Sequence, residues 1–176
     1  MPEKPRQPRV LRINNEIPWA RKHWGTLLQN YRRAKFFSHY ADFFEDLYSK
    51  EWNKLVELNE YMLKWFLSQL GLKVDFESAA NFNFIGKKSD LVLDMCTKLN
   101  AKVYIFGAQG KGYADIKRFQ DADIVPIFQD YKCPTYEQIH GSFHECLSIV
   151  DLLFNCGKTS LDILMSNNLN RSQIAY

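Results

Sequence analysis

The sequence predicts an α/β protein in which a helical N-terminal half precedes a small parallel-sheet αβαβ unit. Apolar residues recur at helical spacing in three stretches before Gly71. After Gly71, short apolar runs alternate with helical patterns. Helices that alternate with buried strands of these lengths are typical of a parallel sheet with crossover connections. The 176 residues are enough for one domain of ordinary size.

The first half is expected to contain three amphipathic helices. The first begins at Pro18, because proline tolerates the first turn of a helix, and its apolar stripe comprises Trp24, Leu27, Leu28 and Tyr31. The second begins near Ala34, and its apolar stripe comprises Phe36, Tyr40, Phe43, Phe44 and Leu47. The third follows Asn53, a candidate N-cap, and ends before Gly71, a candidate C′ glycine.

The second half is expected to begin with a half-buried strand over residues 72–76, where apolar and charged side chains alternate. A helix capped by Ser89 should follow it, and residues 103–106 are expected to form a buried strand. A short helix over residues 113–120 then leads to a strand over residues 124–128. A proline inside this last strand indicates the edge of a sheet or a bulge.

Apolar runs and cysteine usage bound the location of the protein. No apolar run reaches the roughly 18–20 residues that a membrane-spanning helix needs, so we expect no membrane insertion. The N-terminus lacks the apolar core of a secretory signal. Four cysteines form no C-x-x-C pair, and we expect reduced thiols at Cys96, Cys133, Cys146 and Cys156. These features predict a cytoplasmic protein.

Positive charge is concentrated near the N-terminus. Residues 1–35 carry nine Lys or Arg and two Glu, a balance of +7, whereas the remainder carries fourteen basic and eighteen acidic residues, a balance of −4. We expect residues 1–16 to form a flexible, basic, proline-rich arm and residues 166–176 a polar tail. Such an arm can attract the phosphates of nucleic acid, but a solvated charged surface is the commoner meaning of a charge run. Nucleic-acid binding is therefore only an alternative function.

A glycine-rich loop follows the strand expected over residues 103–106. In open α/β sheets this is a common place for ligands, because glycines let backbone N–H groups approach an anion. The candidate ligand-binding residues are Gly107, Gly110, Lys111, Gly112 and Tyr113. The loop matches neither a Walker loop nor a dinucleotide-binding fingerprint. The alternative is a tight turn whose glycines supply left-handed backbone angles.

Residues 136–151 concentrate side chains that can move protons or hold a substrate. The candidate catalytic residues are Tyr136, Gln138, His140 and Asp151. A histidine near a carboxylate can serve as a general acid or base at neutral pH. Ser148 with Asp151 fits either a nucleophile and its partner or, more simply, the cap of an apolar helix from Ile149 to Asn155.

No metal or cofactor is predicted from this region. The possible metal ligands would be Cys133, His140, His144 and Cys146. Their spacing fits no standard zinc pattern, and Gly141 disfavours placing both histidines on one helical face. The identity of a cofactor stays unknown at this point.

Four stretches together resemble the WbqC-like family. They are Lys88-Ser89-Asp90-Leu91, Tyr104-Ile105-Phe106-Gly107, Tyr136-x-Gln138-x-His140-Gly141-x-Phe143 and the eleven residues 147–157. The resemblance extends over residues 13–157, and its last stretch is the most specific. The opening strand and the His- and Pro-containing loop typical of the family are missing. The chain therefore looks like the C-terminal two thirds of the family, a truncated single domain over residues 17–165.

The resemblance implies a role in the biosynthesis of bacterial surface polysaccharides such as O-antigen. The implied reaction is transfer of an acyl or aminoacyl group to an amino sugar, or handling of a nucleotide-activated sugar, which would make the protein a transferase. The alternative is a non-catalytic fragment that docks on a partner chain, and that partner would supply the missing strands.

The residue roles that follow from this resemblance are hypotheses about one shared hollow. The backbone amides of the glycine loop and Lys111 would hold a phosphate, and His140 would handle a proton. Tyr136 and Gln138 would orient the substrate. Asp151 would steady the site or cap its helix.

Overall fold

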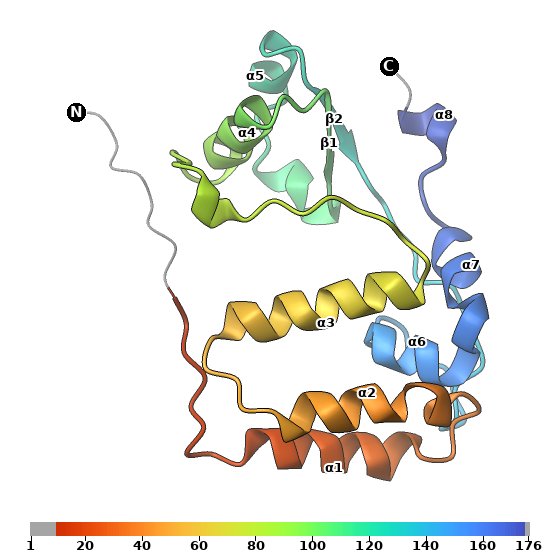
Figure 1. Ribbon diagram of the computed structural model, residues 1–176. Coiled ribbons are helices and arrows are strands. Elements are labelled where there is room, and N and C mark those ends of the chain that lie inside the picture. Colours follow the sequence, from red (N-terminus) through yellow and green to blue (C-terminus); the bar gives the residue numbers. More distant parts are fainter. Residues whose placement is uncertain (1–9, 175–176) are drawn as a thin grey trace. The chain divides into compact units, whose positions relative to one another are not determined.

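The computed structural model describes residues 10–174, and this part of the chain forms two compact units (Figure 1). The helical unit comprises residues 10–75 and 133–166, and the sheet unit comprises residues 76–132 and 167–174. The single domain expected over residues 17–165 stays a prediction.

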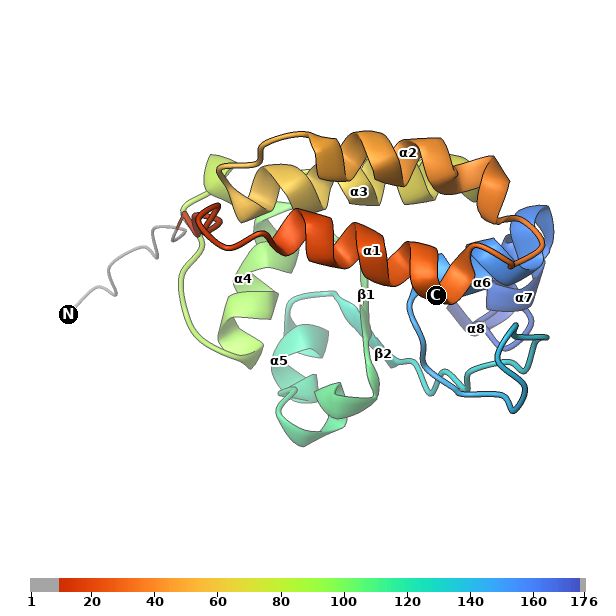
Figure 2. The same ribbon diagram turned by 90° about the horizontal axis from the view of Figure 1, so that it is seen from below.

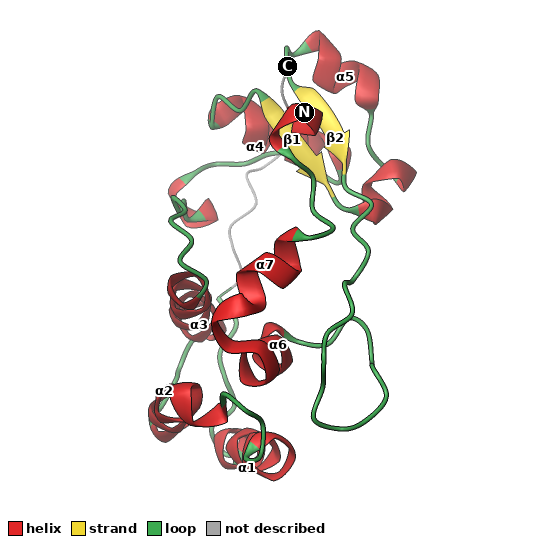
Figure 3. Cartoon of the chain, turned by 90° about the vertical axis from the view of Figure 1, so that its right-hand side faces the viewer, coloured by secondary structure: helices red, strands yellow, loops and turns green. Residues whose placement is uncertain are grey.

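Three long helices of the helical unit run side by side, and Figure 3 views them nearly end-on (Figures 1, 2 and 3). They are α1 (Trp19–Tyr31), α2 (Phe37–Ser49) and α3 (Leu55–Gln69). Two further helices come from the later segment of the unit, α6 (Ile149–Cys156) and α7 (Ser160–Met165). The three amphipathic stripes of the first half therefore predict α1, α2 and α3 correctly.

An aromatic core holds these helices together. Its buried side chains are Ala34, Tyr40, Phe44, Leu47, Leu58, Leu153 and Phe154. The fully buried ring of Phe154 lies 5.0 Å from the ring of Phe37 and 5.4 Å from that of Phe44, between centroids. Aromatic rings bury large areas and prefer tilted or edge-on contacts of this kind. Phe154 thus fixes α6 against α2.

The start of α3 differs from the expectation. Asn53 is not the N-cap; Lys54 is, and its side chain makes no capping hydrogen bond. The Leu55 N–H at the start of the helix instead donates to the Leu11 carbonyl at 3.0 Å, and Arg12 pairs with Lys54 in an antiparallel bridge. The prediction fails because a distant backbone segment satisfies the groups that a cap would serve. Gly71 has φ +68° after the helix, as expected of a C′ glycine.

The sheet unit contains the predicted pair of parallel strands, β1 (Val103–Phe106) and β2 (Val125–Phe128). Val103 lies opposite Val125, and Phe106 lies opposite Phe128. Its helices include α4 (Ser89–Lys98) and α5 (Ile116–Asp121). Its buried core comprises Cys96, Phe106, Phe119 and Ile124. The order of these elements confirms the α/β fold class, with the helices mainly N-terminal.

The connections of the sheet unit differ in detail from the prediction. Residues 72–76 form no strand, and in residues 10–174 no segment pairs with them. A lone extended segment gains no ladder hydrogen bonds, which alternation of side chains cannot replace. Ser89 does not cap α4; its hydroxyl accepts the Asp115 N–H at 2.9 Å. Asp115 is the N-cap of α5, which therefore begins later than expected.

The chain ends lie partly outside the described residues. Of the arm predicted for residues 1–16, residues 1–9 are outside them, and so are residues 175–176 of the predicted tail. Within the tail, residues Arg171–Ile174 form α8. In the part of the chain that is described, no helix combines the length and apolar character needed to cross a bilayer.

Candidate functional site

A buried carboxylate lies at the start of α6. Asp151 is only 3% exposed, although aspartate is almost never fully buried without partners. Ser148 begins the helix as its N-cap, because its Oγ accepts the Val150 N–H at 3.2 Å. The capping interpretation is thus confirmed for Ser148. Asp151 does not return to the cap; its carboxylate is hydrogen-bonded by Asn155 of the same helix and by residues from other segments of the helical unit.

Four neutral groups hydrogen-bond the Asp151 carboxylate. The Tyr136 hydroxyl donates to Oδ2 at 2.7 Å, and Gln138 Nε2 donates to the same oxygen at 3.1 Å. Asn155 Nδ2 donates to Oδ1 at 3.2 Å, and the Tyr31 hydroxyl is a further partner. An acceptor surrounded only by donors suits an ionised carboxylate, which accepts and cannot donate. We call Asp151 with these four residues the Asp151 cluster.

The pKa values of the two tyrosines of the Asp151 cluster are raised. Burial is the main cause that raises the pKa of Tyr31 to about 12, and the hydrogen bond to Asp151 adds to it. Burial and the same carboxylate raise the pKa of Tyr136 well above its usual range. A phenolate next to a carboxylate would place two negative charges together in a poorly solvated place. Both hydroxyls therefore stay donors at neutral pH.

Gln138 also closes the loop that follows it. Its Nε2 donates to the His144 carbonyl at 2.9 Å, and its Oε1 accepts the His144 N–H at 2.8 Å. Gly141, inside this loop, has φ +84°, which a glycine adopts without steric cost. The Ile139 N–H donates to Asn155 Oδ1 at 3.1 Å. The loop over residues 138–144 is thus tied to the helix that carries Asp151.

His140 lies at the edge of this arrangement with one ring nitrogen already assigned. Its Nε2 is 2.8 Å from the carbonyl oxygen of Asn30 at the end of α1. A carbonyl only accepts, so Nε2 carries the hydrogen and Nδ1 of the neutral ring has a lone pair. The His140 ring meets the Tyr31 ring edge-on, with 6.3 Å between centroids. An exposed imidazole of this tautomer can accept a proton from a substrate.

The structure brings the four predicted catalytic residues into one neighbourhood of the helical unit. Tyr136 and Gln138 contact Asp151 directly, and His140 reaches the Asp151 cluster through Tyr31. Tyr31 and Asn155 were not among the residues predicted for the site. Asn155 follows Asp151 by four residues on one helix, which is a detectable spacing. Tyr31 was assigned to an apolar stripe, and nothing in that pattern shows where its hydroxyl points.

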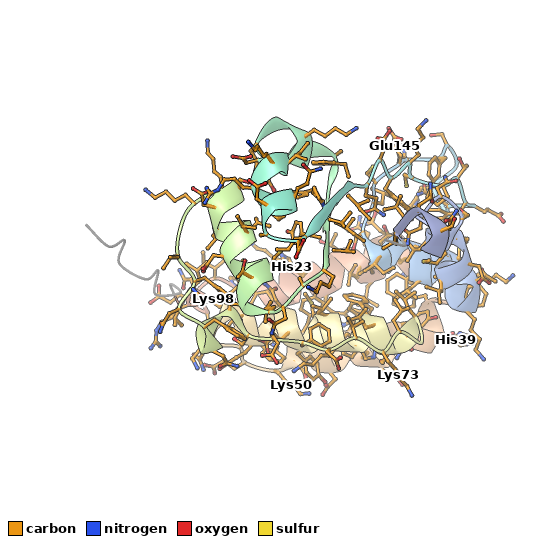
Figure 4. All side chains as sticks on the ribbon, turned by 90° about the horizontal axis from the view of Figure 1, so that it is seen from above. His23, His39, Lys50, Lys73, Lys98 and Glu145 are labelled. Atoms are coloured by element: carbon orange, nitrogen blue, oxygen red, sulfur yellow. The ribbon has the colours of Figure 1, made fainter. Side chains whose placement is uncertain are left out.

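An apolar cavity of about 370 Å³ opens beside the Asp151 cluster, within the helical unit. Its walls come from α1, α2, α3 and the residues around the start of α6, and Tyr31 belongs to both the cavity and the cluster. His23, which is labelled in Figure 4, also lines it. The volume falls in the range of small-molecule sites, roughly 300–1,000 Å³. Sequence patterns gave no sign of this cavity.

The glycine loop belongs to the sheet unit and is mostly a 3₁₀ turn, Ala108–Gly112. The Gly110 N–H donates to the Gly107 carbonyl at 2.8 Å, and the Tyr113 N–H donates to the Gly110 carbonyl at 3.1 Å. These two amides are therefore not free to hold an anion. Lys111 and Gly112 are exposed. Anion binding by the loop stays a prediction, carried mainly by Lys111.

Glycine is required at one position of this loop for a different reason than expected. None of Gly107, Gly110 and Gly112 has a positive φ, so the interpretation as left-handed turn residues is wrong. Gly110 is buried, and a Cβ there would lie 2.5 Å from the Cβ of Phe106. Close packing on β1 is the constraint. Because the loop and residues 136–151 belong to different units, a hollow shared by both stays a prediction.

Two cysteines of the metal hypothesis come together without forming a ligand set. The Cys146 N–H points to Cys133 Sγ at 3.4 Å. Across residues 10–174, no group of three or more His, Cys, Asp or Glu side chains is arranged to hold a metal ion.

These observations define an α/β protein with a buried carboxylate cluster beside an apolar cavity. Sequence comparison identifies the family: the WbqC-like protein family matches residues 3–163, and the chain belongs to it. The uncharacterized protein Rv1507c of Mycobacterium tuberculosis is 30% identical over 148 residues, which are 83% of this chain and 64% of that protein. The chain thus spans less than two thirds of this relative's length. No solved structure matches the chain.

Proposed function

We propose that this chain transfers an acyl or aminoacyl group to an activated amino sugar during the biosynthesis of a bacterial surface polysaccharide such as O-antigen. Membership of the WbqC-like family supports the setting. The observation that carries the reaction is the Asp151 cluster, in which neutral donors hold a buried carboxylate next to a histidine of defined tautomer. The place of action is the cytoplasm, where activated sugars are assembled.

The chemistry that this site suits is proton removal from an amine. In acyl transfer, the amine nitrogen of the sugar forms a bond to the carbonyl carbon of the donor, and the bond from that carbon to the leaving group breaks. The neutral amine attacks through its lone pair, and its nitrogen must lose one proton as the C–N bond forms; Nδ1 of His140 accepts this proton. The proton then passes to the departing group, so that charge and atoms balance.

Tyr136 and Gln138 act on the substrate through the loop that carries His140. Both side chains donate hydrogen bonds to Asp151, and Gln138 also donates to the backbone carbonyl of His144. Their role is to hold His140 at a fixed place, since small displacements of a catalytic group cost large factors in rate. In the sheet unit, Lys111 provides the positive charge for a phosphate of the activated sugar.

The direct test is product formation by the full chain. Purified protein is incubated with nucleotide-activated amino sugars and acyl-coenzyme A donors, and the N-acylated sugar is detected by mass spectrometry. His140→Ala is expected to lower the rate at least a hundredfold, a usual loss for a general base. His144→Ala is the matched control, because only its backbone bonds to Gln138. Equal rates in the two variants would contradict the assignment of His140.

The phosphate role of Lys111 has its own test. Nucleotide sugars are titrated by calorimetry into wild type, Lys111→Ala and Lys117→Ala, the last being an exposed lysine of α5 in the same unit. We expect weaker binding for Lys111→Ala alone. Heats identical in all three proteins would eliminate the loop from the site.

A further inference from the structure

We infer that the apolar cavity of the helical unit receives a short uncharged acyl chain, the acyl part of the donor in the proposed transfer. This inference rests on the proposed function, and it names the donor class and the place where its chain binds.

The walls favour an uncharged apolar group. Half of the lining is apolar, namely Leu27, Phe44, Met62, Phe66 and Val150. The lining contains no Lys, Arg, Asp or Glu side chain. A phosphate would need cations or free amides, and an ammonium group would need a carboxylate, because a charge is costly to bury without a partner. His23 is the only basic side chain of the lining, so the cavity suits an uncharged apolar group better than a nucleotide phosphate or an ammonium group.

Five polar residues line the cavity, His23, Thr26, Tyr31, Tyr48 and Ser148, and several of their groups already have partners. The Thr26 hydroxyl donates to the Lys22 carbonyl at 2.9 Å, and the Tyr31 hydroxyl is bonded to Asp151. The Ser148 oxygen accepts the Val150 N–H, which leaves its own proton free to donate. A sugar ring presents several hydroxyls that all need partners. The groups left to bind a ligand are the Ser148 and Tyr48 hydroxyls and the His23 ring. These are fewer partners than the several hydroxyls of a sugar ring need, whereas they are sufficient for the single carbonyl oxygen of an acyl chain.

The cavity also lies where an acyl chain must lie for the proposed reaction. Tyr31 lines the cavity, bonds to Asp151 and contacts the ring of His140. Ser148 and Val150 line it as well, and both lie within three residues of Asp151. A chain held against Leu27 and Met62 therefore ends near the tyrosine that joins the cavity to the proton-accepting histidine. Apolar burial supplies the binding, and the cluster supplies the chemistry.

Binding is measured with neutral amides, which carry the acyl chain without coenzyme A. The methionine methyl groups of the full chain are labelled with ¹³C, and acetamide, butyramide and hexanamide are titrated while NMR spectra are recorded. Met62 lies in the cavity wall, whereas Met95 of α4 and Met165 of α7 do not line it. We expect only the Met62 signal to move. Kd should fall roughly three- to fourfold for each added methylene.

A matched pair of variants on α1 controls for unspecific binding. Thr26→Phe places a ring at the rim of the cavity from an exposed position, so the fold is preserved. It is expected to weaken hexanamide binding at least tenfold. Gln29→Phe adds the same ring at an exposed position of α1 that does not line the cavity, and it should leave Kd unchanged.

The outcomes separate this inference from the proposed function. A Met62 signal that stays still, or that moves together with Met95 and Met165, overturns the inference. Equal Kd values for Thr26→Phe and Gln29→Phe overturn it as well. Selective binding at Met62 without any acylated sugar in the mass-spectrometric assay would support the cavity and contradict the transfer. Transfer activity without binding at Met62 would support the proposed transfer and contradict the acyl-chain site in the cavity.

Discussion

Residues 136–151, the polar segment of the helical unit, and residues 107–113, the glycine loop of the sheet unit, were both predicted as parts of a site. Their hydrogen bonds differ in the structure. In the polar segment, Tyr136 and Gln138 converge on the buried Asp151. In the loop, the amides of Gly110 and Tyr113 bond to the loop's own carbonyls. Buried polar side chains must find partners, whereas glycine is often explained by packing alone. Polar clusters are therefore the stronger guide to a site.

The largest expected effect in this comparison is at the buried carboxylate. Asp151→Ala leaves the donors of Tyr136, Gln138 and Asn155 without their acceptor. We expect the free energy of unfolding in urea to fall by roughly 3 kcal/mol or more, since each buried donor left unsatisfied costs about 1–3 kcal/mol. Asp162→Ala, at an exposed position of α7, is the control, and it should stay within about 0.5 kcal/mol of wild type. Similar losses of unfolding free energy in both variants would show that the buried Asp151 carboxylate contributes no more to stability than an exposed aspartate.

A smaller effect is expected in the loop, where packing is the proposed constraint. Gly110→Ala forces a methyl group onto Phe106, and overpacking of this kind costs about 1–3 kcal/mol. A Cβ at Gly112 would meet nothing within 4 Å, so Gly112→Ala should be close to neutral. Urea unfolding of the two variants checks this. If Gly112→Ala were the more harmful, the backbone conformation and not Phe106 would be the constraint.

The smallest effect concerns how the free energy of unfolding falls at alkaline pH. The pKa of Tyr31 is about 12 in the folded protein, above its ordinary value of 10.0. The folded state therefore holds this proton more tightly than the unfolded chain does. The resulting stabilisation is complete below pH 10 and is lost as the pH rises toward 12. Tyr31→Phe should flatten this decline in the free energy of unfolding, whereas Tyr113→Phe, at an exposed position, should not. A decline of unchanged steepness in Tyr31→Phe would contradict the raised pKa of Tyr31 in the folded protein.

The sequence predicted those parts of the fold that periodicity controls. The stripes that include Tyr40, Phe44 and Leu47 form the core, because a helix must bury its apolar face. Contacts between distant segments were not predictable in this way. The carbonyl of Asn53 bonds to Ile13, and the extended residues 72–76 lack a pairing strand in the described part of the chain. Both outcomes depend on which distant segments of the chain lie side by side in the folded protein.

The candidate site shows the same division. Residue chemistry singled out Tyr136, Gln138, His140 and Asp151, and these side chains gather in one part of the helical unit. The role of the Tyr31 hydroxyl was not predicted, because the sequence does not distinguish a tyrosine in an apolar stripe from a core residue. The apolar cavity escaped notice for a related reason: a pattern records which face is apolar and not how completely neighbouring helices fill the space.

A double-mutant cycle between Tyr136 and Asp151 tests most directly whether this cluster is an interacting unit. Tyr136→Phe, Asp151→Asn and the double variant are unfolded in urea, and the free energies are compared with wild type. A hydrogen bond of 2.7 Å to a buried carboxylate predicts a coupling energy of about 0.5–3 kcal/mol between the two changes. Effects that add within about 0.3 kcal/mol would show that the two side chains act independently, and the Asp151 cluster would lose its basis.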